Sequence, residues 1–185
     1  IGQMMEKVVL PEQRTRLTDE EVIARCPWAT TGRTHHRTPN IITSLELDPA
    51  EMEKRNIHLQ KKYAEIEENE VRFEELHCED AEYLIVAFGS CARIAQKAME
   101  MAREEGIKVG LLRPITLWPF PSKAIAARAA QVKGILTVEL NAGQMVEDVR
   151  LAVECKVPVE HFGRLGGIVP DPDEVITALK EKLIK

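Results

Sequence analysis

The chain has few aromatic side chains and no hydrophobic run long enough to cross a membrane. Aromatic residues make up 4% of its 185 residues, whereas 44% are hydrophobic, so aliphatic side chains and alanine must fill the core. No apolar run approaches the roughly 20 residues that a membrane-spanning helix needs, and the first residues lack the order of a signal peptide. The sequence therefore favours a soluble, cytoplasmic protein.

Basic residues are also too few to outweigh the acidic ones. The 25 lysines and arginines stand against 30 aspartates and glutamates, which gives a formal net charge of −5 at pH 7. Nucleic acids and anionic membranes repel such a charge. We therefore expect neither a nucleic acid nor a membrane among the partners.

The four cysteines, Cys26, Cys78, Cys91 and Cys155, form no Cys-x-x-Cys pair. This spacing excludes a local zinc ribbon or iron–sulfur ligand set. Cys91 and Cys155 fall inside predicted helices, where we expect them to be small buried residues. We interpret the cysteines as reduced structural thiols, which is the usual state in the cytosol.

Strand-type and helical patterns alternate in the second half of the chain. Strands are predicted over 83–88, 107–112, 135–140 and 157–162, and helices between 90 and 106, over about 122–132 and 144–155, and from 171 onward. Strands separated by single helices indicate crossover connections and a mostly parallel sheet covered on both faces. We predict a three-layer α/β/α fold with a possible antiparallel edge strand near Val71.

The residues before this α/β domain fall into two segments. Residues 1–47 carry scattered apolar residues without sustained periodicity and cannot bury much of themselves. The opening Ile1-Gly2-Gln3-Met4-Met5 is apolar but has no partner element before it, which suggests that the chain was cut from something longer. Asp48-Pro49-Ala50-Glu51 then predicts a helix start, and a charged helix should run to about Glu68. The predicted segments are 1–47, 48–80 with the charged helix and edge strand, and 81–185.

The loop that follows the second strand has an unusual composition. Arg113-Pro114 ends the strand, because proline cannot donate to a sheet ladder. Four large apolar residues, Ile115, Leu117, Trp118 and Phe120, follow, although loops are normally polar. We interpret this loop as covered either by its own chain or by another surface, and we take Leu117, Trp118 and Phe120 as interface candidates.

Polar groups at the predicted strand ends are the other candidates, because ligands of open α/β sheets bind there. Glu139 and Asn141 follow the third strand, and Glu139 could accept a hydrogen bond from Arg113 on the preceding strand. We expect these groups to fix loops rather than to perform acid–base chemistry. Arg113, Glu139 and Asn141 therefore join the interface candidates.

Three further signals have simple structural explanations. Gly89-Ser90 lacks a dinucleotide or P-loop motif and is typical of a strand-to-helix turn. His161 near Arg164 could bind phosphate, but a capping role is simpler. His35-His36 has no third metal ligand nearby. We predict no catalytic, cofactor-binding or metal-ligating residue in this chain.

Several longer runs resemble one known family. They are Glu79 to Gly89, Gly106 to Pro121, Val138 to Gln144 and Gly163 to Gly167, with Gly2 to Glu6 and Trp28 to Gly32 upstream. These runs resemble the C-terminal portion of the alpha subunit of 2-oxoacid:ferredoxin oxidoreductases, of the 2-oxoisovalerate and 2-oxoglutarate type. Residues 113–121, Arg-Pro-Ile-Thr-Leu-Trp-Pro-Phe-Pro, are the most specific part.

The resemblance implies a fold similar to the C-terminal domain of transketolase, with a five-stranded mixed sheet whose first strand runs against the others. It implies an enzyme that decarboxylates a 2-oxoacid on thiamine diphosphate and Mg²⁺, reduces ferredoxin through iron–sulfur clusters and makes an acyl-coenzyme A. The implied partners are beta, gamma and ferredoxin-like delta subunits. Because nearly all of the alpha chain's first domain is missing, residues 1–47 would be its tail and a linker, and this chain would be an assembly domain, inactive alone and without cofactors of its own.

Two other interpretations stay open. One is a free-standing ligand-binding or regulatory module in which Gly89-Ser90 and residues 163–167 hold a small anion. The other is the beta chain of an NAD-linked 2-oxoacid dehydrogenase, although the charged helix and the Trp-Pro-Phe-Pro string favour the ferredoxin-linked family. The sequence does not indicate which 2-oxoacid is used.

Overall fold

The computed structural model describes residues 10, 12–13, 15–29 and 40–184. The chain divides into two compact units, one of residues 6–60 and one that contains residues 61–184. Helix α1 (Asp19–Arg25) lies in the first unit, and helix α2 (Pro49–Asn69) begins in the first unit and ends in the second. The His35-His36 pair lies outside the described residues.

Helix α1 was missed by the sequence analysis. The Thr18 hydroxyl accepts the backbone N–H of Glu21 at 3.3 Å, and the Glu21 carboxylate accepts the backbone N–H of Thr18 at 2.8 Å. This reciprocal capping box satisfies two N–H groups that a helix start otherwise leaves unpaired. The Thr-x-x-Glu spacing is visible in the sequence, but the helix has 7 residues, too few for a sustained apolar period.

Helix α2 begins where the sequence predicts. The Asp48 carboxylate accepts the backbone N–H groups of Ala50 at 2.8 Å and Glu51 at 3.2 Å, and Pro49 is the first helical residue. None of the helix residues is buried, in agreement with the predicted charged helix. Within the described part of the chain, no helix is both long and apolar enough to cross a bilayer.

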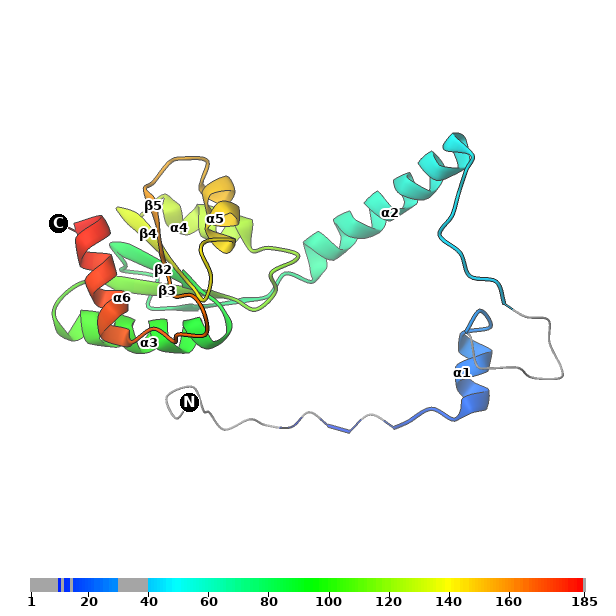
Figure 1. The fold of residues 1–185 in the computed structure, drawn as a ribbon, viewed down its shortest axis with the longest axis horizontal. Coiled ribbons are helices and arrows are strands. Elements are labelled where there is room, and N and C mark those ends of the chain that lie inside the picture. Colours follow the sequence, from blue (N-terminus) through cyan, green and yellow to red (C-terminus); the bar gives the residue numbers. More distant parts are fainter. Residues whose placement is uncertain (1–9, 11, 14, 30–39, 185) are drawn as a thin grey trace. The chain divides into compact units, whose positions relative to one another are not determined.

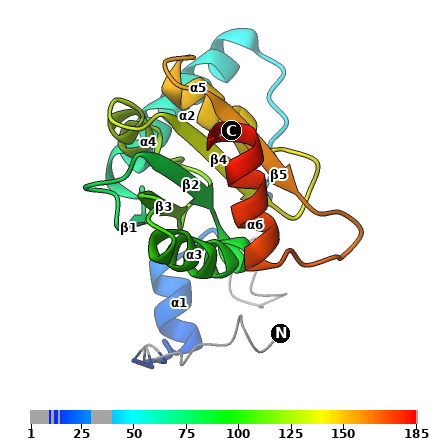
Figure 2. The same cartoon turned by 90° about the vertical axis from the view of Figure 1, so that its left-hand side faces the viewer.

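The second unit is built on a five-stranded sheet (Figure 1) in the order β1-β3-β2-β4-β5, and Figure 2 labels all of its strands. The strands are β1 (Phe73–Leu76), β2 (Tyr83–Ala87), β3 (Val109–Pro114), β4 (Gly134–Glu139) and β5 (Val159–Gly163). β1 pairs antiparallel with β3, and all other neighbours pair parallel. The mostly parallel sheet with a reversed first strand is therefore confirmed.

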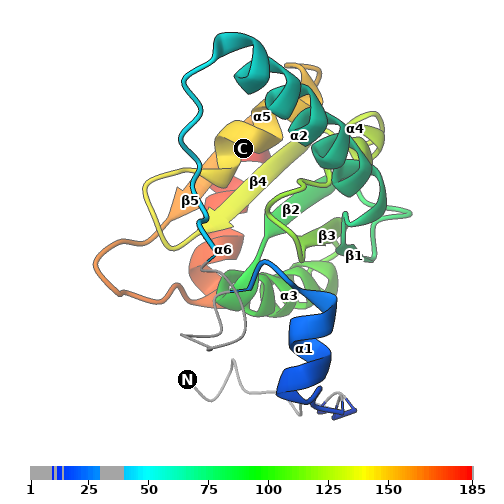
Figure 3. The same cartoon turned by 90° about the vertical axis from the view of Figure 1, so that its right-hand side faces the viewer.

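Two pairs of helices cover the two faces of this sheet. Helices α3 (Gly89–Glu104) and α6 (Pro172–Leu179) lie on one face, and α4 (Ser122–Ala129) and α5 (Met145–Val153) lie on the other, as Figure 2 and Figure 3 show from opposite sides. A π-helical turn, η2 (Lys180–Ile184), continues α6. The predicted three-layer α/β/α class is confirmed.

Successive side chains of each strand alternate between the hydrophobic cores on the two faces of the sheet. In β2, Ile85 packs with α3 and α6, whereas Leu84 and Val86 pack with α4 and α5. All three are at most 1% exposed. A strand covered on both faces has a continuous apolar sequence, because successive side chains point to opposite faces and both faces are buried.

The cysteines agree with the prediction only in part. All four are unbonded thiols, and Cys78 and Cys91 are buried. Cys155 is exposed, so the prediction that it is a small buried helical residue is wrong. Helix α5 ends at Val153, and Glu154 and Cys155 then adopt left-handed backbone conformations with φ of 51° and 59°, which turn the chain out of the helix.

Candidate functional site

The carboxyl ends of β2, β3, β4 and β5 share one edge of the sheet, because these strands are parallel. Open α/β proteins bind their ligands at this edge. The segments that follow the strands here begin at residues 88, 115, 140 and 164. A polar cluster centred on buried Glu139 lies where β4 ends beside β5, and exposed apolar side chains lie in the segments after β3, β4 and β5.

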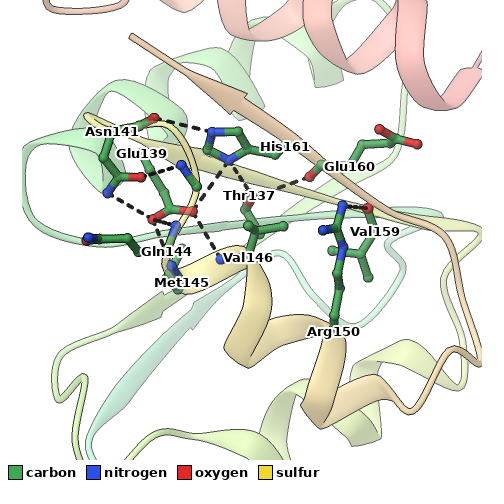
Figure 4. Close-up of polar contacts among 11 residues, drawn as sticks. Thr137, Glu139, Asn141, Gln144, Met145, Val146, Arg150, Val159, Glu160 and His161 are labelled. Carbon is green, nitrogen blue, oxygen red and sulfur yellow. Dashed lines mark hydrogen bonds and ion pairs between the residues drawn. The ribbon is translucent and has the colours of Figure 1, made fainter. Parts of the chain in front are cut away.

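Glu139 is the centre of the polar cluster (Figure 4). It is the last residue of β4 and is only 1% exposed. Its Oε2 accepts the backbone N–H groups of Gln144 at 3.2 Å and Met145 at 2.9 Å, and its Oε1 accepts that of Val146 at 3.0 Å. The carboxylate thus occupies the N-terminus of α5, a position that suits an anion.

Asn141 and His161 complete the cluster. The Asn141 Nδ2 donates to Glu139 Oε2 at 3.1 Å, and its Oδ1 accepts the backbone N–H of Gly143 at 2.7 Å. His161 Nε2 lies 3.3 Å from the backbone oxygen of Asn141, and its Nδ1 lies 3.4 Å from Glu139 Oε1. Glu139, Asn141 and His161 therefore fix residues 140–144 between β4 and β5.

Thr137 escaped the sequence analysis, and so did the packing role of Gly163, which was named only within residues 163–167. Thr137 is fully buried on β4, and its hydroxyl lies 3.2 Å from His161 Nδ1. A polar residue inside the apolar run 135–138 was the available signal. At Gly163, an added Cβ would lie 2.2 Å from the backbone oxygen of Asn141 and 2.6 Å from His161 Nε2, so only glycine fits there.

The predicted hydrogen bond between Arg113 and Glu139 is wrong. β2 lies between β3 and β4, so the two residues are not on neighbouring strands. Arg113 instead pairs with Glu74, which lies opposite it on antiparallel β1, with Nη1 2.9 Å from Oε2. Glu139 and Asn141 are brought together, whereas Arg113 lies on β3, next to the edge strand β1.

His161 and Arg164 also have separate partners. Arg164 Nη2 lies 3.4 Å from Glu174 Oε1 at the start of α6, and His161 faces the Glu139 cluster. The contacts of His161 serve to hold a loop. They give no support to a phosphate site built from these two residues.

The backbone of the apolar loop is attached to its own chain. The backbone N–H groups of Ile115 and Thr116 donate to the backbone oxygen of Arg72 at 2.9 and 3.1 Å. The Thr116 hydroxyl donates to the backbone oxygen of Pro119 at 2.8 Å, and the peptide before Pro119 is cis. Phe120 packs against the core beneath α4 and α5. One of the three apolar candidates is therefore turned inward.

Leu117 and Trp118 point out of the domain instead. They are 48% and 56% exposed, and the ring of Trp118 meets the ring of Tyr63 on α2 edge to face, with 5.7 Å between centroids. Exposed apolar residues also follow the other strands. Together they form what we call the apolar edge: Ile115, Leu117, Trp118, Leu140, Leu165, Ile168 and Val169.

The apolar edge accounts for nearly all exposed large hydrophobic side chains of the α/β domain. Within residues 81–184, Leu151 on α5 is the one exposed large hydrophobic residue outside it. Exposed apolar groups gathered in this way mark surfaces that bind other molecules, since scattered ones would be distributed over all faces. Seven of the eight exposed large hydrophobic residues of 81–184 therefore follow the carboxyl ends of the strands.

The described residues form no metal site, and two of the cysteines are buried. No three His, Cys, Asp or Glu side chains among them are arranged to hold a metal ion. Burial raises the pKa of the Cys78 and Cys91 thiols to about 11, so both stay protonated near neutral pH. These two cysteines are structural.

Comparison with curated proteins identifies relatives over almost the whole chain. Ketoisovalerate oxidoreductase subunit VorB of Methanothermobacter thermautotrophicus is 43% identical over 181 residues, which cover 98% of this chain and 49% of the relative. 2-Oxoglutarate synthase subunit KorA of Archaeoglobus fulgidus is 30% identical over 174 residues, which cover 92% of this chain and 48% of the relative. The chain thus spans about half the length of these relatives.

Two solved structures are similar to this chain in fold. The 2-oxoglutarate:ferredoxin oxidoreductase from Magnetococcus marinus, solved with 2-oxoglutarate, coenzyme A and succinyl-CoA bound, has a TM-score of 0.67 and 26% identity over 80% of this chain and 28% of that chain. A split-gene transketolase, an inactive beta4 tetramer, has a TM-score of 0.53 at 21% identity over 61% of this chain and 41% of that chain. The second likeness concerns the fold alone.

The comparison with family models covers the α/β domain. Residues 81–175, more than half of the chain, match the model of pyruvate:ferredoxin oxidoreductase core domain II. This match confirms, at the level of the family, the resemblance inferred from the sequence. The two curated relatives described above are oxidoreductase subunits. This chain belongs to the pyruvate:ferredoxin oxidoreductase core domain II family.

Proposed function

We propose that this chain is the C-terminal part of the alpha subunit of a cytoplasmic, thiamine diphosphate-dependent 2-oxoacid:ferredoxin oxidoreductase, and that it serves as an assembly domain. The complete enzyme would decarboxylate a 2-oxoacid, form the acyl-coenzyme A and reduce ferredoxin. Its other parts would be beta, gamma and ferredoxin-like delta subunits. Residues 1–47 would be the tail of the preceding domain and a linker, 48–80 a charged helix and edge strand, and 81–185 a transketolase C-terminal-like domain.

The described residues do not fit the cofactors of such an enzyme. A diphosphate at the N-terminus of α5 would compete with the Glu139 carboxylate, which already accepts three backbone N–H groups there. No three side chains converge as metal ligands in the described ranges, and Cys78 and Cys91 are separately buried thiols. We therefore assign thiamine diphosphate, Mg²⁺ and the iron–sulfur clusters to other parts of the complex.

The apolar edge is the observation that carries the assembly role. Leu117 and Leu165 follow different strands, yet both leave about half of their side-chain surface exposed at the same end of the sheet. Burial of such side chains stabilises an interface, and aromatic anchors such as Trp118 concentrate that stabilisation. Leu117 and Trp118 would contact the partner directly.

The four other interface candidates would support the exposed residues of the apolar edge rather than contact the partner. Phe120 packs into the core, and Arg113 pairs with Glu74. Glu139 and Asn141 hold the segment that presents Leu140. They would contribute to assembly by holding the exposed residues in position.

The alternatives have less support. An anion-binding module would hold its anion with Gly89-Ser90, at the start of α3, and with residues 163–167, but Arg164, the cation of the second segment, pairs with Glu174. An NAD-linked dehydrogenase beta chain fits less well than the ferredoxin-linked family, whose domain model covers residues 81–175.

Co-purification tests the proposal. We would co-express the chain with beta, gamma and delta subunits from the same source, compare it with a Leu117→Ser/Leu165→Ser variant, and use Leu151→Ser as the control outside the edge. We expect wild type and control to co-purify and the double variant to be lost, with unchanged thermal melting of the chain alone. Equal co-purification of all three, or no co-purification of wild type, would overturn the assembly role.

A further inference from the structure

A groove of about 970 Å³ lies next to the apolar edge. One wall is the last part of α2, with Ala64, Glu67 and Glu68, and the other is the segment of residues 118–124. Val71 and Phe73 line the groove between the two walls. All these residues belong to the unit that contains residues 61–184, so the groove lies within one compact body.

The groove has an apolar lining and an acidic wall. Trp118, Pro119, Phe120 and Pro121 supply most of one side. Across from them, the exposed carboxylates of Glu67 and Glu68 have no ion-pair partner in the part of the chain that the structure describes. Lys123 is the one cationic side chain in the lining, so the acidic groups are in excess.

The position of Trp118 is set by the same helix that brings the carboxylates. Tyr63 meets Trp118 edge to face at 5.7 Å, one helical turn before Glu67. The indole ring and the two carboxylates therefore line a single groove. An arginine suits such a combination, because its guanidinium pairs with carboxylates in a planar fork and stacks on aromatic faces.

Charge complementarity points to the occupant. We propose that the groove receives a segment of a partner subunit in which an arginine is flanked by apolar residues, with the arginine on Glu67 and Glu68 and the apolar residues on Trp118 and Phe120. A small ligand suits the groove less well, since such sites converge several polar groups on one point, whereas here Glu67 and Glu68 lie on one wall and Ser122 and Lys123 on the other. The inference rests on the proposed assembly role and adds the chemistry of the partner.

Charge reversal in the co-expressed complex tests the contact. The Glu67→Lys/Glu68→Lys variant is compared with Glu53→Lys/Glu65→Lys, which makes the same change in charge at exposed positions of α2 outside the groove lining. We expect the groove variant to weaken binding of the partner subunits about tenfold or more, because it places like charges against the arginine. The control should change the dissociation constant by no more than about twofold, as expected for charges outside a contact.

Cross-linking identifies the occupant. A photoreactive benzoylphenylalanine replaces Ser122, an exposed residue of the lining, in the assembled complex. We expect mass spectrometry to find a cross-linked partner peptide with an arginine between apolar residues. Changing that arginine to glutamate should restore binding of the Glu67→Lys/Glu68→Lys variant.

Several outcomes would overturn the inference: equal binding by the groove and control variants, a cross-link to an acidic segment or to a second copy of this chain, or no cross-link in a complex that forms. The assembly role fails separately. If Leu117→Ser/Leu165→Ser abolishes the complex while Glu67→Lys/Glu68→Lys does not, the assembly role stands and the groove assignment is wrong. If neither variant has an effect, both are wrong.

Discussion

Glu139, at the end of β4, accepts the backbone N–H of Val146, at the start of α5, at 3.0 Å. A side chain of the strand therefore takes the place of a ligand at the helix that follows it. This contact links the sheet to the loop of residues 140–144. It makes the carboxylate a structural element of the edge that carries Leu140.

Replacement of Glu139 by glutamine should destabilise the domain. The amide has one acceptor oxygen where the carboxylate has two, so at least one of the N–H groups of Gln144, Met145 and Val146 loses its acceptor. A lost charged hydrogen bond in a buried site costs about 2 kcal/mol. Urea denaturation of the chain measures this loss. Glu160→Gln, on neighbouring β5, should change stability by less than about 0.5 kcal/mol, and equal effects of the two changes would contradict the role of Glu139.

Gly163→Ala should be costly, because the added Cβ would meet the backbone oxygen of Asn141 at 2.2 Å. Backbone cannot yield as a side chain does, so we expect a loss of about 2 kcal/mol or more. Gly134→Ala is the matched control. There the Cβ would meet the end of the Leu183 side chain at 2.8 Å, which can rotate away. Thermal melting compares them, and a larger loss for Gly134→Ala would show that the contact at Gly163 is not the limiting one.

Stability should depend on the ionisation of Glu75 at acidic pH. Its carboxylate accepts hydrogen bonds from Arg128 at 2.6 and 2.9 Å, and this contact lowers the pKa of Glu75 below its usual 4.5. Folding is therefore favoured while the group is charged, above about pH 4.5, and the contribution is lost as pH falls through the lower folded value.

Glu75→Gln separates this effect from other carboxylates. We expect the variant to be less stable than wild type at pH 7 by about 1 kcal/mol, and the difference to shrink as pH falls below 4.5. Chemical denaturation at pH 7, 5 and about 3 measures the difference. A constant or growing difference toward low pH would show that the ion pair is not the cause.

The exposed thiol of Cys155 should react where the buried ones do not. Cys78 and Cys91 are at most 3% exposed, and burial raises the pKa of each to about 11. Treatment of the folded chain with iodoacetamide near neutral pH should therefore modify Cys155 and leave those two intact. Peptide mapping by mass spectrometry assigns the sites, with denatured chain as the positive control. Rapid modification of Cys91 in the folded chain would contradict its buried position.

Trp118→Ala should separate assembly from folding. Because Trp118 is more than half exposed, its loss should change the melting of the isolated chain little. As an interface anchor its loss should weaken subunit association by roughly 2 kcal/mol or more. Leu151→Ala, at an exposed site outside the apolar edge, is the control in the same binding assay. A loss of folding stability equal to the loss of association would identify Trp118 as a residue of the domain's own core.

Much of this fold could be predicted, because each signal was local. Asp48 marked the start of α2, and the run 83–88 predicted β2 almost to the residue. The pairing of Arg113 was not local. Its partner depends on β2 inserting between β3 and β4, and the order of strands along the chain does not give their order in the sheet.

The candidate site, like the fold, could be predicted only in part. The sequence placed Glu139 and Asn141 together at a strand end, and the structure brings them to 3.1 Å. It could not show that the Glu139 carboxylate bends back onto α5, because that depends on the turn of residues 140–144. Cys155 was misplaced because the helix ends two residues before it, at Val153, without a glycine to mark the end.

The reversed strand β1 restricts how another protein can approach. It presents four residues at the side of the sheet, and two of them, Glu74 and Glu75, are engaged by Arg113 and Arg128. A short strand with charged side chains discourages another chain from adding a strand beside it. β1 therefore disfavours a partner that would pair its backbone with this edge of the sheet, whereas β5, at the opposite edge, pairs with β4 alone among the described strands. A protein that binds at the β1 side would do so through side chains, without any rearrangement of the sheet.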